Sequence, residues 1–106
     1  MKNRAALFLL AISALLTMHS FAYSSDWKNA MQNSEKALEA GNYSAAFDLA
    51  KESLKYAETE FGKKSEYYAQ SLSRAGAAKL LAGEYNEAIE YFLETKNLYA
   101  EIFGRD

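Results

Sequence analysis

The stretch AGNYSAAF, Ala40 to Phe47, returns forty-two residues later as AGEYNEAI, Ala82 to Ile89. Identical pairs at the same interval continue beyond these stretches: Glu52 with Glu94, Phe61 with Phe103 and Gly62 with Gly104. A fixed period of about 20 to 50 residues is typical of supersecondary units that stack on one another. The chain is therefore expected to build one structural unit twice.

The residues of each copy indicate a pair of helices. The chain contains no proline, and apolar residues recur at intervals of three and four without strand-like alternation. Gly41 and Gly83 stand where a helix must end, because glycine adopts the left-handed conformation without a Cβ penalty. Ser25 and Ser65 are the expected N-caps. We therefore predict an all-α fold of two antiparallel hairpins, with helices at about 26–40, 43–61, 65–82 and 85–103.

Small side chains mark the place where the two helices of each hairpin cross. Ala46 and Ala88 lie at the predicted crossing, and Gly76 offers a matching gap that Ser34 occupies in the first copy. Small residues opposite one another allow two helix axes to approach closely. We expect the wedge beside each turn to be filled by a tyrosine, Tyr43 or Tyr85.

The first 22 residues have the pattern of a secretory signal peptide. Lys2 and Arg4 precede an apolar run at 5–17, and Ser20 and Ala22 supply the small residues of a cleavage site. Thirteen helical residues span about 20 Å, short of a hydrocarbon core of about 30 Å, which favours cleavage after Ala22 over a retained anchor. We expect an exported protein, periplasmic or secreted, with no membrane attachment after cleavage and one domain at 23–106.

The expected domain is acidic and lacks cysteine. Removing Lys2 and Arg4 leaves ten basic against fourteen acidic side chains, a net charge of −4. That balance argues against a protein that binds nucleic acid and against one that binds a membrane surface through a cluster of basic residues. The absence of cysteine excludes a lipid-anchored lipoprotein and means that packing must stabilise the fold without disulfides.

Nothing in the sequence indicates catalysis, a metal site or a cofactor. The single histidine, His19, lies in the predicted signal peptide, so no imidazole or thiol remains for a nucleophile or a soft metal site. The carboxylates spaced at three and four fit a solvated helix face better than a calcium site: Glu84, Glu87, Glu90 and Glu94. The tyrosines fit the role of packing residues between helices better than that of a stacking platform for a glycan. We therefore expect a non-enzymatic protein.

The pattern G-x-Y-x-x-A, with Ala50 or Phe92 four residues further on, resembles the tetratricopeptide repeat. The interval of 42 and the FG that ends each copy resemble the long-helix variety found in kinesin light chains and many bacterial proteins. Residues 71–104 follow this pattern well, whereas Asn33 and Ala37 replace its leucine and tyrosine in the first copy. The resemblance extends from Trp27 to Gly104. It implies repeats at about 26–62 and 65–104, arranged as a fragment of a right-handed superhelix.

The resemblance also implies a role in binding other proteins. In this family the first helix of each hairpin lines a concave groove that holds a peptide or helix. On this chain the groove positions are Lys28, Met31, Glu35, Leu38, Gln70, Ser73, Ala77 and Leu80, with Arg74 close by. This lining is mixed and does not match the Lys/Asn-rich clamp that some members use for C-terminal carboxylates.

The last helix suggests a second surface. Its apolar residues occupy more than one stripe, so that one stripe can pack inward while others remain to contact another helix. The alternative to groove binding is therefore a structural subunit that forms a homodimer through this helix, with Tyr91, Leu98 and Ile102 on the contact face.

Overall fold

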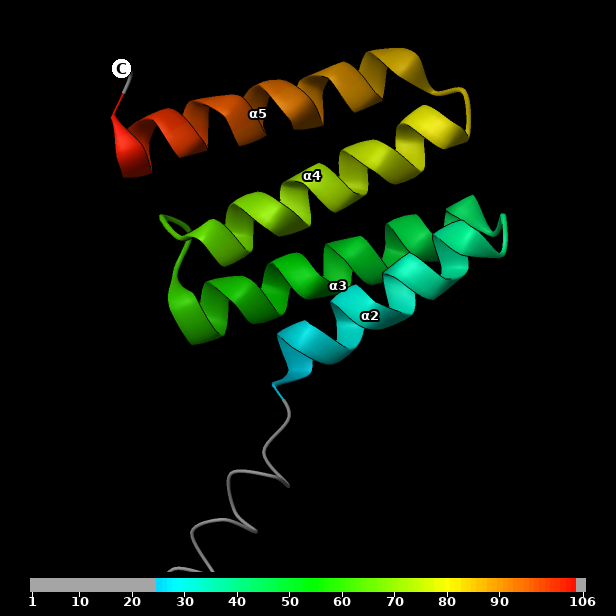
Figure 1. The fold of residues 1–106 in the computed structure, drawn as a ribbon, viewed down its shortest axis with the longest axis horizontal. Coiled ribbons are helices and arrows are strands. Elements are labelled where there is room, and N and C mark those ends of the chain that lie inside the picture. The colour runs from blue at the N-terminus through cyan, green and yellow to red at the C-terminus, as the bar shows by residue number, and fades with distance from the viewer. Residues whose placement is uncertain (1–24, 105–106) are drawn as a thin grey trace, which may run out of the picture.

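The computed structural model describes residues 25–104 of the 106-residue chain, and the predicted signal peptide at 1–22 lies outside them. Four helices follow one another in this part of the chain: α2 (Asp26–Glu39), α3 (Tyr43–Phe61), α4 (Glu66–Leu81) and α5 (Tyr85–Phe103). Each runs antiparallel to its neighbour in the stack of Figure 1. The predicted all-α fold of two hairpins is confirmed, and each predicted helix agrees with the observed one to within one residue.

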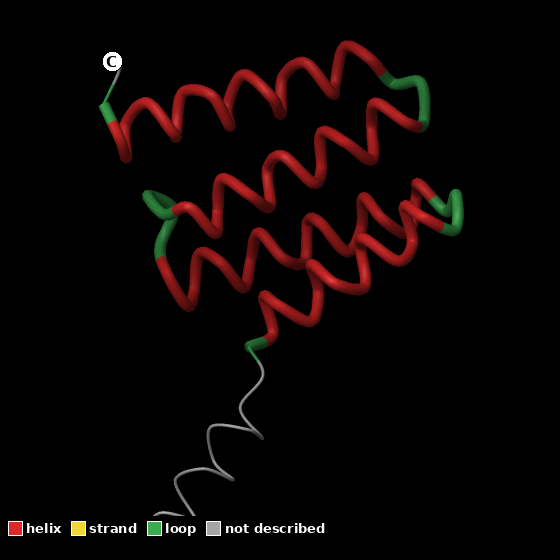
Figure 2. Tube along the Cα trace, viewed as in Figure 1, coloured by secondary structure: helices red, strands yellow, loops and turns green. Residues whose placement is uncertain are grey.

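The predicted start and stop residues explain these boundaries. The Ser25 hydroxyl accepts a hydrogen bond from the Lys28 amide at 3.0 Å, and the Ser65 hydroxyl accepts one from the Tyr68 amide at 3.2 Å. Each bond satisfies an amide that has no partner within its helix. The turns within the hairpins, green in Figure 2, pass through Gly41 at φ 77° and Gly83 at φ 82°, in the left-handed region.

Successive helices pack in chain order around a core of small residues. The α3 helix contacts both α2 and α4, and α4 contacts α5. Alanine dominates the fully covered positions, which include Ala46, Ala50, Ala57, Ala69, Ala75 and Ala88. Because so little side-chain volume separates the helices, their axes can approach closely and dispersion contacts between backbones contribute to stability.

The helices of the two hairpins cross at equivalent positions, but different side chains fill the space at the crossing. In the first copy the Ser34 hydroxyl donates to the Ala46 carbonyl at 2.8 Å. In the second copy Gly76 lies against the Phe92 ring, so that a Cβ at Gly76 would stand 2.8 Å from Phe92 Cε1. The position equivalent to Phe92 in the first copy is Ala50. A larger residue on one helix is thus matched by a smaller one on the other.

The expectation for the two wedge tyrosines is correct for one of them only. Tyr43 is half-buried and lines a small hollow with Ala78 of α4 and with Ala82, the C-cap of that helix. Tyr85 is 62% exposed, so the prediction that it fills a wedge is wrong. The reason is that α4 covers Tyr43, whereas no further helix follows α5 in the part of the chain that the structure describes.

Candidate functional site

The predicted groove residues lie on α2 and α4, at equivalent positions of the two hairpins. Lys28, Glu35, Gln70 and Leu80 are exposed, and the remaining five are half-buried: Met31, Leu38, Ser73, Arg74 and Ala77. None is closed off by packing, although α4 buries six residues along its other sides. The first helices of both hairpins therefore offer accessible side chains at repeated positions.

Contacts of the buried Ser71 show directly that α2 and α4 meet. Ser71 of α4 accepts a hydrogen bond from Trp27 Nε1 at 2.8 Å, and its oxygen lies 3.8 Å from the sulfur of Met31. Met31 is thus the predicted groove residue that the structure places beside the opposite helix. The short Trp27–Ser71 bond fixes the N-terminal end of α2 against α4.

An aromatic cluster stands at this end of the molecule. The rings of Phe61 and Tyr67 are stacked with centroids 3.9 Å apart, and Trp27 meets Tyr67 edge-on at 4.9 Å. Such pairs contribute about 0.5–1.5 kcal/mol beyond area burial. No sequence pattern predicted that these three residues would meet, because they come from three different helices. Their nearest sequence signal is the short α3–α4 connection, which holds Phe61 and Tyr67 six positions apart.

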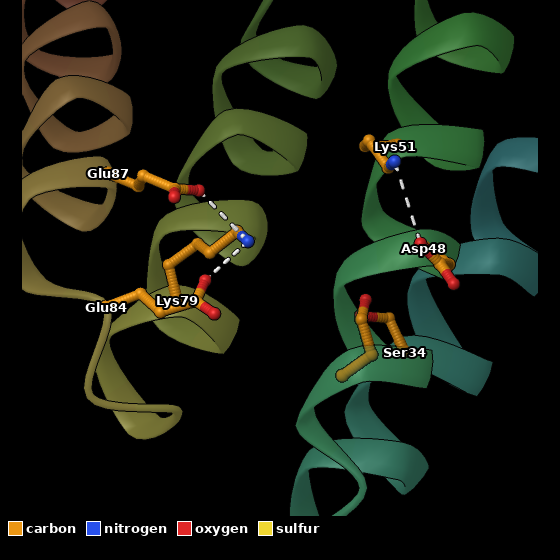
Figure 3. A network of polar contacts seen from close by, with 7 residues as sticks. Ser34, Asp48, Lys51, Lys79, Glu84 and Glu87 are labelled. Carbon is orange, nitrogen blue, oxygen red and sulfur yellow. Dashed lines mark hydrogen bonds and ion pairs between the residues drawn. The ribbon is translucent and has the colours of Figure 1, made fainter.

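The most connected charge in the described chain is Lys79. Its Nζ lies 2.5 Å from Glu84 Oε2 and 3.0 Å from Glu87 Oε2 (Figure 3). The same nitrogen lies 4.1 Å from the centroid of the Phe47 ring. Hydrogen bonds to Glu84 and Glu87 raise the pKa of Lys79 above its ordinary value. A lysine held in its charged form by two carboxylates ties α4 to the start of α5, and is not a candidate for base chemistry.

A shallow hollow lies between α4 and α5. Its volume is about 380 Å³, and its lining mixes charge with apolar surface: Lys63, Lys64, Tyr68, Leu72, Glu94, Asn97, Leu98 and Glu101. Leu98, one of the predicted assembly residues, forms part of its wall. The two lysines and two glutamates at its rim favour a peptide-like occupant over an apolar small molecule.

The predicted assembly residues on α5 are partly covered. Tyr91, Leu98 and Ile102 are half-buried, and the Tyr91 ring meets Phe47 of α3 edge-on at 5.8 Å. Burial raises the pKa of the Tyr91 hydroxyl. The large side chains of α5 that project furthest into solvent are others: Tyr85, Ile89, Leu93 and Phe103. The role of Tyr91, Leu98 and Ile102 in assembly stays a prediction.

Neither a metal-ion cluster nor a helix that could span a membrane occurs among residues 25–104. Residues 25–104 contain no group of three or more His, Cys, Asp or Glu side chains placed to hold a metal ion. None of the described helices is long and apolar enough to cross a membrane. Every buried side-chain nitrogen or oxygen in this region has a hydrogen-bond partner, so no orphaned polar atom marks a ligand position.

Comparison with known families gives one match. The tetratricopeptide repeat family model matches residues 37–101, more than half of the chain. The chain belongs to the tetratricopeptide repeat family. Tetratricopeptide repeats generally act as protein–protein interaction scaffolds and are typically non-catalytic, so proteins are the expected class of partner. No curated protein and no solved structure gave a significant match.

Proposed function

We propose that this tetratricopeptide repeat protein is exported and binds a peptide or helix of another protein on the face shared by α2 and α4. The observation that carries the proposal is the accessibility of all nine predicted groove residues on α2 and α4, while six other residues of α4 are buried. Side chains kept accessible at equivalent positions of consecutive repeats form an extended surface. The interval of 42 residues supports the long-helix variety of the family.

The chemistry of this face favours a mixed ligand. Met31, Leu38 and Leu80 supply apolar surface, and Lys28 and Glu35 add one charge of each sign. An apolar anchor gives most of the affinity in such interfaces, while charges at the rim set orientation and association rate. We propose a short amphipathic segment as the ligand. A bare C-terminal carboxylate fits less well because the face lacks a cluster of lysines.

Export rests on the sequence of residues 2–22 and has its own test. Expression of the full-length chain in a bacterial host, followed by intact-mass analysis of the periplasmic and culture fractions, should give a species that begins at Tyr23. Recovery of the uncleaved chain in the cytoplasm would contradict export and leave the binding proposal standing.

Site-specific crosslinking tests the binding face. A photo-crosslinking amino acid at Ser73 should capture a protein in the source cells, and the same group at Thr59, exposed on α3, serves as the matched control. Introducing Leu80→Glu together with the Ser73 probe should abolish the captured band, because a charge then replaces apolar surface. Equal capture from Ser73 and Thr59, or capture that survives Leu80→Glu, would refute the assignment of this face.

Self-assembly through α5 is the second candidate, favoured by the exposed apolar side chains of that helix. Leu98 and Ile102 are half-buried, which gives these positions less free surface than the exposed Ile89 and Leu93. Light scattering across a hundredfold concentration range should show a dimer if this candidate is correct. Leu98→Glu and Ile102→Glu should then return the protein to a monomer, and a constant monomer mass would eliminate this candidate.

A further inference from the structure

The hollow between α4 and α5 lies apart from the predicted groove on α2 and α4. Its volume is about 380 Å³, within the range of about 300–1,000 Å³ that binding pockets generally have. Leu72, which is 4% exposed, supplies an apolar floor together with the half-buried Tyr68 and Leu98. The lining comes from residues 63–101 and includes none of the predicted groove residues. The hollow is therefore a second place where a ligand can contact this protein.

Opposite charges reach this apolar floor from two different elements. Lys63 and Lys64 come from the connection between α3 and α4, whereas Glu94 and Glu101 come from α5. The two glutamates are seven positions apart on one helix, which separates them by about 10.5 Å along its axis. The hollow therefore has a basic side and an acidic side, with apolar surface between them.

Most of these polar groups have no partner within residues 25–104. Lys63 lies 3.8 Å from Glu58, but Lys64, Glu94 and Glu101 make no ion pair in this region. A ligand that pairs with these three side chains breaks no contact within the described chain. Such a ligand avoids one of the costs that reduce affinity.

The first hairpin shows how the equivalent carboxylate is satisfied internally. In that copy Glu52 occupies the position of Glu94, and its carboxylate accepts a hydrogen bond from the Tyr56 hydroxyl at 3.1 Å. The position of Tyr56 is occupied by Leu98 in the second hairpin, so Glu94 lacks this donor. The second hairpin thus has an unpaired carboxylate beside an apolar side chain where the first has a closed contact.

We propose that this hollow binds a short extended segment of another protein, in which an apolar residue lies between a basic and an acidic one. The basic side chain pairs with Glu94 or Glu101, and the acidic one pairs with Lys64. The apolar side chain covers Leu72 and Leu98 and supplies most of the affinity. This site is separate from the face of α2 and α4 and does not depend on the function proposed for that face.

The size of the hollow favours an extended segment over a helix. A single turn of α-helix is about 5.4 Å long and 10–12 Å wide with its side chains, so it occupies about 420–610 Å³. This volume exceeds that of the hollow. Three residues of an extended chain advance by about 10 Å, which matches the distance along α5 between its two glutamates.

The test selects peptides that depend on the acidic side of the hollow. A display library of random heptapeptides is depleted on the variant Glu94→Lys/Glu101→Lys and then selected on the wild-type protein at low ionic strength, where exposed charges are least screened. Both side chains are exposed, so the variant should fold, which circular dichroism verifies. We expect the selected peptides to share an apolar residue with a basic and an acidic neighbour.

Fluorescence anisotropy then measures the binding of the selected peptides. We expect Glu94→Lys/Glu101→Lys to weaken binding about tenfold or more, because each change places a like charge beside the basic residue of the peptide. The matched control, Glu52→Lys/Glu90→Lys, makes the same change in net charge at exposed positions outside the hollow and should have little effect.

Each outcome decides for or against the hollow. Binding that is lost in Lys63→Glu/Lys64→Glu and kept in Leu80→Glu supports it, whether or not the face of α2 and α4 binds a partner. If no peptide survives depletion, or if the survivors carry basic residues alone, the proposal is overturned. Displacement by millimolar free lysine, leucine and glutamate would assign the hollow to small zwitterions instead. A protein mass that doubles with concentration, and returns to the monomer value in the variant Glu94→Lys/Glu101→Lys, would assign it to a second copy.

Discussion

Replacing Gly76 by alanine adds one methyl group, which has two opposing effects on the stability of the fold. In most helix interiors Gly→Ala stabilises by about 1 kcal/mol, because alanine loses less backbone entropy. At Gly76 the added Cβ would lie 2.8 Å from Phe92 Cε1, 3.0 Å from Cδ1 and 3.1 Å from Cζ. Carbon atoms at optimal separation stand about 3.5–4.0 Å apart, so the Phe92 ring must move or the helices must separate.

The overlap should outweigh the gain in helix propensity. Small-to-large changes in packed cores cost about 1–3 kcal/mol, and subtracting a propensity gain of about 1 kcal/mol leaves a net loss near 1 kcal/mol. For a domain of this size that loss lowers Tm by about 4–8 °C. The first hairpin supports the reasoning, because it has the larger Ser34 at this position and the smaller Ala50 where Phe92 would stand.

A double-mutant cycle with Phe92→Ala isolates the contact. Once the ring is removed, Gly76→Ala should stabilise by about 1 kcal/mol, so the coupling between the two sites is about 2 kcal/mol. Urea denaturation followed by circular dichroism gives the four free energies of unfolding. If Gly76→Ala changes stability by the same amount with and without the ring, close contact with Phe92 is not the reason for glycine at this position.

Two further changes test local features of the fold. Ser65→Ala removes the N-cap of α4 and should lower the free energy of unfolding by about 1 kcal/mol, while the exposed Ser44→Ala should have little effect; equal effects in urea denaturation would contradict the capping role. Lys79→Met keeps the stem over Phe47 and removes the charge. Because Glu84 and Glu87 raise the pKa of Lys79 in the folded state, its contribution to stability is complete below the unfolded pKa of about 10.4 and is lost as pH rises through the higher folded value. The difference in stability between wild type and Lys79→Met should therefore be constant from neutral pH to about pH 9 and shrink above it, and a difference that grows above pH 10 would refute the ion-pair explanation.

Local signals were enough to predict the helices and their ends. Gly41 and Gly83 identify the turns because few other residues adopt positive φ, and Ser65 identifies a helix start because its hydroxyl binds an amide three residues on. The pairing into hairpins followed from the repeat, since two copies of a unit must pack in the same way. These inferences depend only on residues close in sequence or on identity between copies.

Burial on α5 could not be predicted in the same way. Tyr43 and Tyr85 stand in the same motif, yet one is half-buried and the other is exposed, because burial depends on the helix that follows. Helical periodicity gives the angles between side chains around the helix axis, but not which side of the helix faces a neighbouring helix. For the same reason the sequence did not show that Tyr91, one of the predicted contact residues, is half-buried. The T-shaped contact between Phe47 and Tyr91 joins residues 44 positions apart, and no local pattern reports it.

The outer side of α2 is polar where α4 carries Ser71, Ala75 and Ala78, since the equivalent residues Asn29, Asn33 and Lys36 are exposed. In the second hairpin the equivalent positions hold small buried residues, which lets α4 lie close against α3. A copy of the first hairpin placed after α3 would instead bury Asn33 and Lys36 against apolar side chains such as Tyr43 and Phe47. The two hairpins are therefore not interchangeable: the second can follow another hairpin, whereas the first would bury polar side chains if it did.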